Sequence, residues 1–196
     1  MSEAGGSAST WPAILTWQAH DVPRMELVRV HVSGNRVKAN GRIVAAATTS
    51  HPAFSASYDL VTDEAGGTKR LSMRVTLAER ERQLSIARDE ENMWLVQQQT
   101  GESSRAAYDG ALDVDVVFSP FFNALPIRRT GLYQRSDSIS CPVVYVRVPE
   151  LTVETAVISY SSAEDGIKLH SPVAETTISV DSDGFILDYP GLAERI

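Results

Sequence analysis

Apolar and polar residues alternate along much of this chain. The alternation is clearest at residues 28–32, 71–77, 112–118 and 144–148, where Val, Leu, Met or Phe stands at every second position. Successive side chains of a β-strand point to opposite faces of the sheet, so this period predicts strands that bury one face. A run rich in β-branched residues, 153–160, predicts a further strand.

Short segments with the chemistry of turns separate the predicted strands. Glycine-containing segments of this kind lie at residues 33–35, 64–67, 109–110, 165–166 and 183–184. Glycine adopts the positive φ that many tight turns require. Short strands at such spacing predict an antiparallel meander rather than alternating βα units.

Helical patterns are weak. Residues 77–86 do not keep a 3.6-residue period, and we interpret them as a strand, a turn near residues 79–82 and another strand. Ser119 and Pro120 suit the start of a helix, which predicts one helical turn over residues 119–124. The sequence therefore predicts an all-β protein with very little helix.

With few helices to cover it, the apolar face of such a sheet has to be covered by the sheet itself, which must curl or fold over. The interior is then either filled with side chains or left as a pocket, and the sequence leaves both open. We expect residues 11–196 to form a single domain, and residues 1–10, rich in Ser, Gly and Ala, to form a disordered leader.

The chain has 196 residues and a formal net charge of −7. This charge repels nucleic acids and anionic membranes unless a basic patch overrides it, and the sequence shows no basic run beyond Arg128-Arg129. We therefore expect no nucleic-acid partner. The single cysteine, Cys141, excludes an intrachain disulfide.

The N-terminal residues lack the basic and apolar regions of a signal peptide, and no apolar run approaches the roughly 20 residues that span a bilayer. We expect a cytoplasmic protein without stable membrane insertion. The four histidines show no metal-ligand spacing, and nucleophile-elbow, phosphate-loop and dinucleotide motifs are absent. We expect neither a metal nor a cofactor, and the oligomeric state stays open.

Asp113 and Asp115 share one face of a predicted strand, about 6.6–7 Å apart. Paired carboxylates can act as acid and base or hold a hard cation. Two acids on a solvated strand face more often pair with arginines, and Arg128 and Arg129 follow soon after. We favour ion pairing and keep catalysis as the alternative.

Residues 119–129 form the least ordinary segment, with two prolines, two phenylalanines, Asn123 and the arginine pair. Because proline fixes φ, we expect a rigid irregular connection. On an extended chain Arg128 and Arg129 point in opposite directions, so one is expected to bond an aspartate and the other to face ligand or solvent. Trp17 and Trp94 either line a pocket or are core residues whose indole N–H is bonded.

A family resemblance rests on residues 109–115, 118–120, 123–129 and 180–195. These segments resemble the hallmark and the ending of a bacterial family called "putative glycolipid-binding" proteins, and the likeness runs from about residue 17 to residue 195. The run Leu-Pro-Ile-Arg-Arg is the most distinctive part. This chain departs from the family pattern by Phe122, Ala124 and Thr130.

The resemblance implies a single antiparallel sheet that is strongly curved into a spiral β-roll or half-barrel, similar in shape to bacterial carriers of lipoproteins and lipids. It implies a lipid or glycolipid as the partner and carries over no catalytic residue. The residues that we expect near such a ligand are Trp17, Trp94, Asp113, Asp115, Asn123, Arg128, Arg129 and Tyr189.

Three functional hypotheses follow. The first is non-enzymatic binding of a lipid or glycolipid in the concave interior of the curved sheet. The second is an enzyme that acts on a small glycosylated or acylated metabolite with Asp113 and Asp115. The third is a structural interaction module without a small ligand.

Overall fold

The computed structural model describes residues 11–196 of the chain. The predicted leader, residues 1–10, lies outside the described residues. The strands and helices, in chain order, are β1 (Ala13–Ala19), β2 (Arg24–Ser33), β3 (Arg36–Ala45), β4 (Phe54–Thr62), β5 (Thr68–Thr76), β6 (Glu81–Arg88), β7 (Trp94–Gln98), β8 (Ser103–Ala106), the 3₁₀ turn η1 (Tyr108–Gly110), β9 (Asp113–Val116), α1 (Pro120–Thr130), β10 (Ser138–Arg147), β11 (Thr152–Ala163), β12 (Gly166–His170), β13 (Glu175–Val180), β14 (Ile186–Tyr189) and β15 (Ala193–Arg195).

All strands belong to one sheet, ordered β8-β7-β6-β5-β4-β3-β2-β1-β15-β14-β13-β12-β11-β10-β9. The predicted fold class is confirmed, since 57% of the structure is strand and 8% helix, and the sheet is curved without closing into a barrel. The pairing of β9 with β10 departs from the antiparallel rule and is parallel. Parallel neighbours need a crossover connection, and α1 lies within it.

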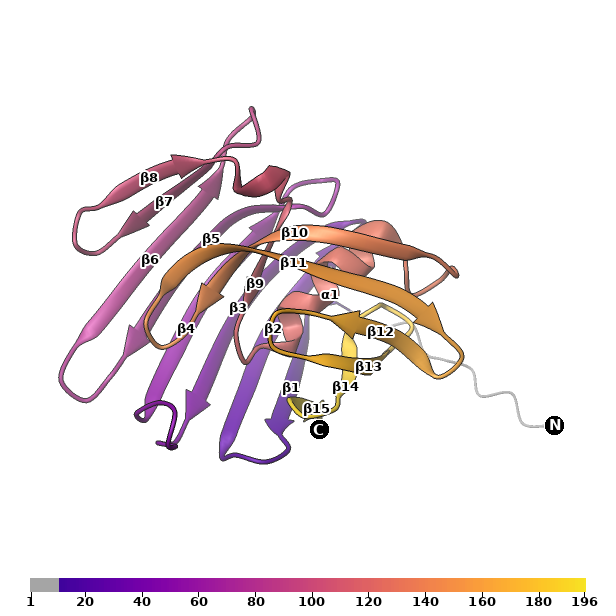
Figure 1. The fold of residues 1–196 in the computed structure, drawn as a ribbon, viewed down its shortest axis with the longest axis horizontal. Helices are drawn as coiled ribbons and strands as arrows, with labels where there is room; N and C mark the ends of the chain where they lie inside the picture. The colour runs from indigo at the N-terminus through magenta and orange to yellow at the C-terminus, as the bar shows by residue number, and fades with distance from the viewer. Residues whose placement is uncertain (1–10) are drawn as a thin grey trace.

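Strands β8 and β9 follow each other in the chain but lie at opposite ends of the sheet. The short connection 107–112 forces these two ends to lie near each other. Strand β9 then lies against β5: the Thr68 N–H donates to the Leu112 carbonyl over 2.8 Å, and the Val114 N–H donates to the Thr68 hydroxyl over 3.4 Å. The sheet is therefore rolled, with strands β10–β13 crossing over the N-terminal strands (Figure 1).

The alternation of the sequence is reproduced in the strands. Along β2, Val28 and Val30 are buried while Arg29 and His31 are exposed. The turn predicted at residues 33–35 joins β2 to β3, as the sequence indicates. Of the strand, turn and strand predicted over 77–86, the second strand forms as β6 from Glu81, whereas the first strand, β5, already ends at Thr76 and the connection lies at residues 77–80, earlier than predicted.

The segment after β9 differs from its prediction, because α1 continues to Thr130 instead of ending after one turn. Pro120 occupies the first turn, as expected, and the Gly131 N–H ends the helix by donating to the Arg128 and Ile127 carbonyls at a φ of 69°. Pro126 lies inside the helix, where it removes one backbone bond. Packing compensates, since every residue from Pro120 to Ile127 is buried.

Helix α1 fills the space that the rolled sheet encloses. Figure 1 shows it between the N-terminal strands and strands β10–β13. The ring of Phe121 stacks with those of Tyr58 on β4 and Phe185 before β14, at 6.2 and 6.1 Å between centroids. Phe122 lies 5.0 Å from the Tyr58 ring. The middle of the roll is therefore a packed core around the helix.

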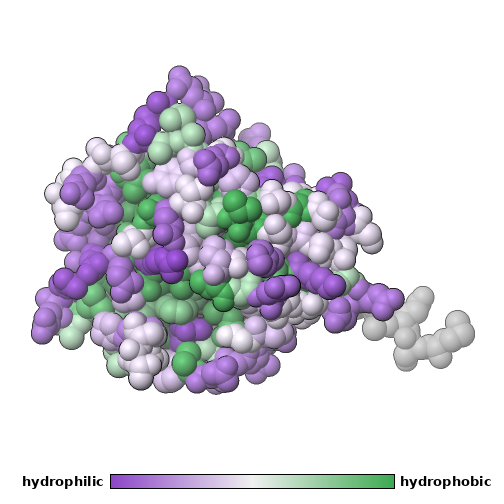
Figure 2. Space-filling model, in the orientation of Figure 1, coloured by the Kyte–Doolittle hydropathy of each residue, from purple (hydrophilic) through white to green (hydrophobic). Residues whose placement is uncertain are grey.

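The face in Figure 2, which carries the outer side of β10–β13, mixes hydrophilic and hydrophobic residues, and the hydrophobic ones form separate groups. In the part of the chain that the structure describes, no helix is long and apolar enough to cross a bilayer. The expectation of one domain over residues 11–196 stays a prediction, to which the single continuous sheet gives support.

The packed interior yields a prediction about Phe122, which is 1% exposed. Phe122→Ala removes a ring that contacts both the sheet and the helix, so the free energy of unfolding should fall by about 3–5 kcal/mol. Urea titration measures this change. Val157→Ala on β11, where the side chain is 51% exposed, should change stability by less than about 0.5 kcal/mol. Equal effects of the two changes would contradict a helix-filled core.

Candidate functional site

The N-terminus of α1 lies in the interior of the roll, beside the buried carboxyl group of Glu26 on β2. The Ser119 and Tyr58 hydroxyls donate to Glu26 Oε1 over 2.5 and 2.6 Å, and the Phe121 N–H also bonds this carboxyl. The first N–H groups of a helix have no partner within the helix. Ser119 makes no capping bond with its own side chain, so Glu26 supplies the acceptor from a neighbouring strand.

Tyr58 reaches Glu26 by lying across Gly41. The register pairs Gly41 with Tyr58 on β4 and with Val28 on β2, so the ring crosses one strand to reach the next. A Cβ at position 41 would overlap the Tyr58 ring. Glycine is therefore required here by close approach.

Burial raises the pKa of Glu26 to about 7, against the hydrogen bonds from Ser119 and Tyr58, which lower it. Its second oxygen, Oε2, has no hydrogen-bond partner among the described residues. An unpaired carboxylate oxygen in an apolar core is costly, which favours the protonated form of Glu26 up to neutral pH.

Ser119 also borders a cavity of about 430 Å³. This volume is within the range of about 300–1,000 Å³ that is typical of small-molecule sites. Strand β9, the start of α1, β10 and the turns after β12 and β14 form its walls. The lining residues are Asp115, Val116, Val117, Phe118, Ser119, Asn123, Tyr145, Arg147, Ser171, Val173, Ala174, Tyr189, Pro190, Gly191 and Leu192.

Asp115 lines this cavity together with Asn123. The Asn123 side-chain amide donates to Asp115 Oδ1 over 3.3 Å, and the Tyr160 hydroxyl donates to Asn123 Oδ1 over 3.2 Å. Burial, with a smaller contribution from the charges of Glu26 and Asp113, raises the pKa of Asp115 to about 7. Near neutral pH this carboxyl can therefore either donate or accept a hydrogen bond.

Tyrosines and an arginine complete the cavity wall. Burial raises the pKa of Tyr145 to about 12 and that of Tyr189 further still, and Asp115 adds to both shifts. Both phenols therefore keep their O–H at physiological pH. Arg147 bonds Glu154 over 2.9 Å and lies over the Tyr145 ring.

Asp113 forms a different contact from Asp115. The Arg129 guanidinium donates to Asp113 Oδ2 over 2.7 and 3.2 Å, which confirms the predicted ion pair. The solvated face expected for the two aspartates is wrong, because α1 covers it and Asp113 is 0% exposed. Burial raises the pKa of Asp113, and the charge of Arg129 opposes this shift.

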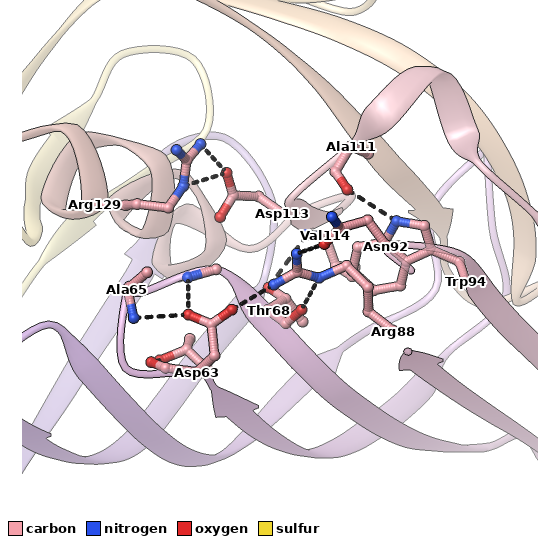
Figure 3. Close-up of polar contacts among 12 residues, drawn as sticks. Asp63, Ala65, Thr68, Arg88, Asn92, Trp94, Ala111, Asp113, Val114 and Arg129 are labelled. Carbon is pink, nitrogen blue, oxygen red and sulfur yellow. Dashed lines mark hydrogen bonds and ion pairs between the residues drawn. The ribbon is translucent and has the colours of Figure 1, made fainter. Parts of the chain in front are cut away.

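Figure 3 places the Asp113–Arg129 pair beside a second polar group that joins β9 to the N-terminal strands. Arg88 on β6 donates to Asp63 Oδ2 over 2.6 Å and to the Thr68 carbonyl over 2.9 Å. The expectation of an ion-paired corner therefore holds, although its arginine arises from a helix and not from an extended segment.

The remaining predicted residues lie away from the cavity. The indole N–H of Trp17 donates to the Ile186 carbonyl, and that of Trp94 to the Ala111 carbonyl, each over 2.9 Å in the core. Arg128 lies over the Phe185 ring and bonds the Asp183 carbonyl. Of the eight residues predicted near a ligand, the fold brings Asp115, Asn123 and Tyr189 together at the cavity.

The comparison with protein families gives a match over residues 14–195, to the family described as "Putative glycolipid-binding". The chain belongs to this family. Its fold is similar to that of a DUF1089 family protein from Pseudomonas aeruginosa, solved by crystallography, with a TM-score of 0.71 and 24% identity over 97% of this chain and 100% of the other. A comparison with curated proteins gives no match.

Two departures from the family pattern noted in the sequence, Phe122 and Ala124, are 1% and 0% exposed and line the core. Neither borders the cavity. In this family member they therefore affect packing and not the lining of the site.

The sequence predictions include neither Glu26 nor Tyr58, although the alternation of apolar and polar residues in β2 does indicate that Glu26 is buried. Glu26 stands two residues before Val28 and four before Val30, so its carboxyl group lies on the same, buried face of β2. Tyr145, Tyr160 and the turn over residues 171–174 carried no comparable signal. Among residues 11–196, no group of three or more His, Cys, Asp or Glu side chains is placed to hold a metal ion.

The raised pKa of Asp115 predicts a pH dependence of stability. In the folded chain the carboxyl stays protonated up to about pH 7, whereas in the unfolded chain it ionises near pH 3.9. The unfolded state then binds fewer protons between these values, so stability falls as pH rises from about 4 to 7 and levels off above. Asp115→Asn should reduce this slope by up to about 1.4 kcal/mol per pH unit.

Urea titrations at several pH values measure this slope. Glu79→Gln, in the exposed turn after β5, is the matched control and should leave the slope of the wild-type protein unchanged. Parallel curves for the wild type and Asp115→Asn would show that Asp115 is ionised in the folded protein at low pH.

The close approach at Gly41 yields a second prediction. Gly41→Ala should destabilise the fold by about 1–3 kcal/mol, because the added methyl group displaces the Tyr58 ring from Glu26. Loss of the native tyrosine environment in near-ultraviolet circular dichroism should accompany the loss of stability. Lys38→Ala on the exposed face of the same strand should change neither by a comparable amount.

Proposed function

We propose that this protein binds a lipid or glycolipid without transforming it, and that the polar head of the ligand occupies the cavity beside the N-terminus of α1. The observation that supports this most is the mixed lining of the cavity. The buried side chains of Asp115, Asn123 and Tyr189 offer hydrogen bonds, and Phe118, Val173 and Leu192 add apolar surface. An amphiphile with a hydroxylated head matches both parts.

The ligand would therefore lie at the N-terminus of α1 and not in the middle of the roll. The phenylalanines of α1 occupy the interior, and we assign the ligand to the cavity at the helix start. Val173 is 62% exposed and lies at the cavity. The apolar part of a ligand would leave the cavity along such residues, while the head stays between β9 and β10. The family description, which names glycolipid binding, agrees with this class of ligand.

The enzyme hypothesis has one observation in its favour. A buried carboxyl with a pKa near 7 at a cavity is typical of acid–base catalysis. The two aspartates do not act as a pair at the cavity, because Asp113 bonds Arg129 and does not border the cavity. A single-carboxyl mechanism through Asp115 is the form that remains to be tested.

Native mass spectrometry of freshly purified protein tests binding. We expect a co-purifying species with the mass of a lipid or glycolipid, which reappears after delipidation and incubation with a bacterial lipid extract. Ala174→Trp fills the cavity, so the bound species should be absent from this variant. Ala163→Trp, a half-buried alanine beside the β11–β12 turn, is the matched control and should retain it.

The outcome separates the three hypotheses. Absence of any bound species in both the wild type and the control, with a folded protein, would favour an interaction module and contradict binding. A change in the mass of the lipid during incubation, abolished by Asp115→Asn, would instead establish the enzyme.

A further inference from the structure

The outward face of strands β2–β5 is basic, although the chain as a whole carries a net charge of −7. The sequence contains no basic run that corresponds to this face, because the cations are spread over separate strands at alternating positions. The exposed carboxylate on these four strands is that of Asp59, which bonds Asn40. The exposed cations on the same strands are Arg29, Arg36, Lys38, Arg42, Lys69, Arg70 and Arg74.

The register arranges these cations in rows across the sheet. Arg42 on β3 pairs with Ser57 on β4, and Ser57 pairs with Arg74 on β5. Four residues further along these strands, Lys38 on β3 and Arg70 on β5 flank Val61 on β4 in the same way. Neighbouring strands lie about 4.8 Å apart, so the two cations of each row are separated by about 10 Å at their Cα atoms.

Two hollows lie along these rows. One of about 650 Å³ includes Arg42, Arg74 and the hydroxyl groups of Ser55, Ser57 and Ser72 in its lining, together with the carboxylates of Asp59 and Glu81. The other, of about 410 Å³, is bordered by Arg36, Lys38, Lys69, Arg70 and Arg88 and by no carboxylate. Of these cations, Arg36 and Arg88 form ion pairs, with Glu64 and Asp63. The others have no carboxylate within ion-pair distance among the described residues, and they can accept external anions.

Exposed aliphatic side chains stand beside the arginines on this face. Ile14 on β1 pairs with Arg29, and Leu27 pairs with Arg42. Met25 and Val44 pair with each other at the end of the same two strands. These four side chains are 63%, 46%, 44% and 53% exposed, in the order Ile14, Leu27, Met25, Val44. Cations and aliphatic groups therefore alternate across one outward surface.

We propose that this surface, the outward face of β1–β5 from Ile14 to Arg74, docks on an anionic lipid bilayer. Lipid phosphates attract the arginines and lysines, and the aliphatic side chains enter the boundary between headgroups and acyl chains. A nucleic acid would pair with the cations but would leave the aliphatic groups beside them in water, and no aromatic residue is among the exposed large apolar side chains of residues 11–196. The inference is independent of the cavity and of its ligand.

Flotation with lipid vesicles tests this proposal on the full chain. Vesicles of equal parts phosphatidylglycerol and phosphatidylcholine should bind the protein at about 0.05 M salt and release it at about 0.5 M, because salt screens the attraction. Vesicles of phosphatidylcholine alone should not bind it. Because the chain carries a net charge of −7, anionic vesicles repel the protein as a whole. Binding to them would therefore require a local basic surface.

Arg42→Gln with Arg74→Gln should weaken binding roughly 25-fold, at about fivefold for each charge that is removed near the lipid surface. The matched control is Arg135→Gln with Lys168→Gln, which removes the same charge from exposed positions elsewhere and should bind within about twofold of the wild type. Met25→Ser with Val44→Ser should also weaken binding, since it removes apolar surface. Circular dichroism and thermal unfolding verify that each variant is folded.

Three results would overturn the proposal: no binding to anionic vesicles at low salt, an equal loss in the control pair, or arginine-dependent binding to duplex DNA without binding to vesicles. Ala174→Trp should leave vesicle binding unchanged. The tests of bilayer docking and of ligand binding in the cavity can therefore fail independently of each other.

Discussion

The hydrogen bonds between the Glu26 carboxyl group and the start of α1 are the constraint on which the rest of the structure depends. A helix that begins inside an apolar roll cannot satisfy its first N–H groups with water. Glu26 on β2 provides the acceptor, and Tyr58 fixes the carboxyl from β4 across Gly41. Three adjacent strands and the helix are thereby held in one arrangement, and the position of Asn123, one turn further along α1, follows from it.

The same arrangement explains why the interior contains weakly acidic groups. Glu26 and Asp115 both bond the first residues of the helix segment, through Ser119 and Asn123; both are buried, and the pKa of each is raised to about 7. Burying two ionised carboxylates would cost more than hydrogen bonds return. A protonated carboxyl at the cavity can donate to a hydroxyl or carbonyl of a ligand, which a carboxylate cannot do. The polarity of the cavity is thus tied to the packing of the helix.

Much of the fold was readable from the sequence, whereas the site was readable only in part. The period of two residues identified the strands because half-buried strands impose it directly. The sequence predicts too short a helix because Pro126 disfavours helical structure locally. In the structure, burial of Phe121 and Phe122 outweighs that local preference. Asp115 and Asn123 were found from an unusual segment, but the residues opposite them come from turns near the C-terminus, whose proximity depends on the roll.

The roll also separates the charges of the chain in a way that composition cannot express. An acidic chain places its neutralised carboxyls inside, at the helix start, and gathers exposed arginines on the outward side of β2–β5. The cations of this face are isolated from one another in the sequence, and the register of the meander brings them together in rows across successive strands. The inward face of β2 holds the helix through Glu26, and its outward face carries Leu27 and Arg29. One strand therefore links the packing that shapes the cavity to the surface that meets the exterior, which is possible because consecutive residues point to opposite sides of the sheet.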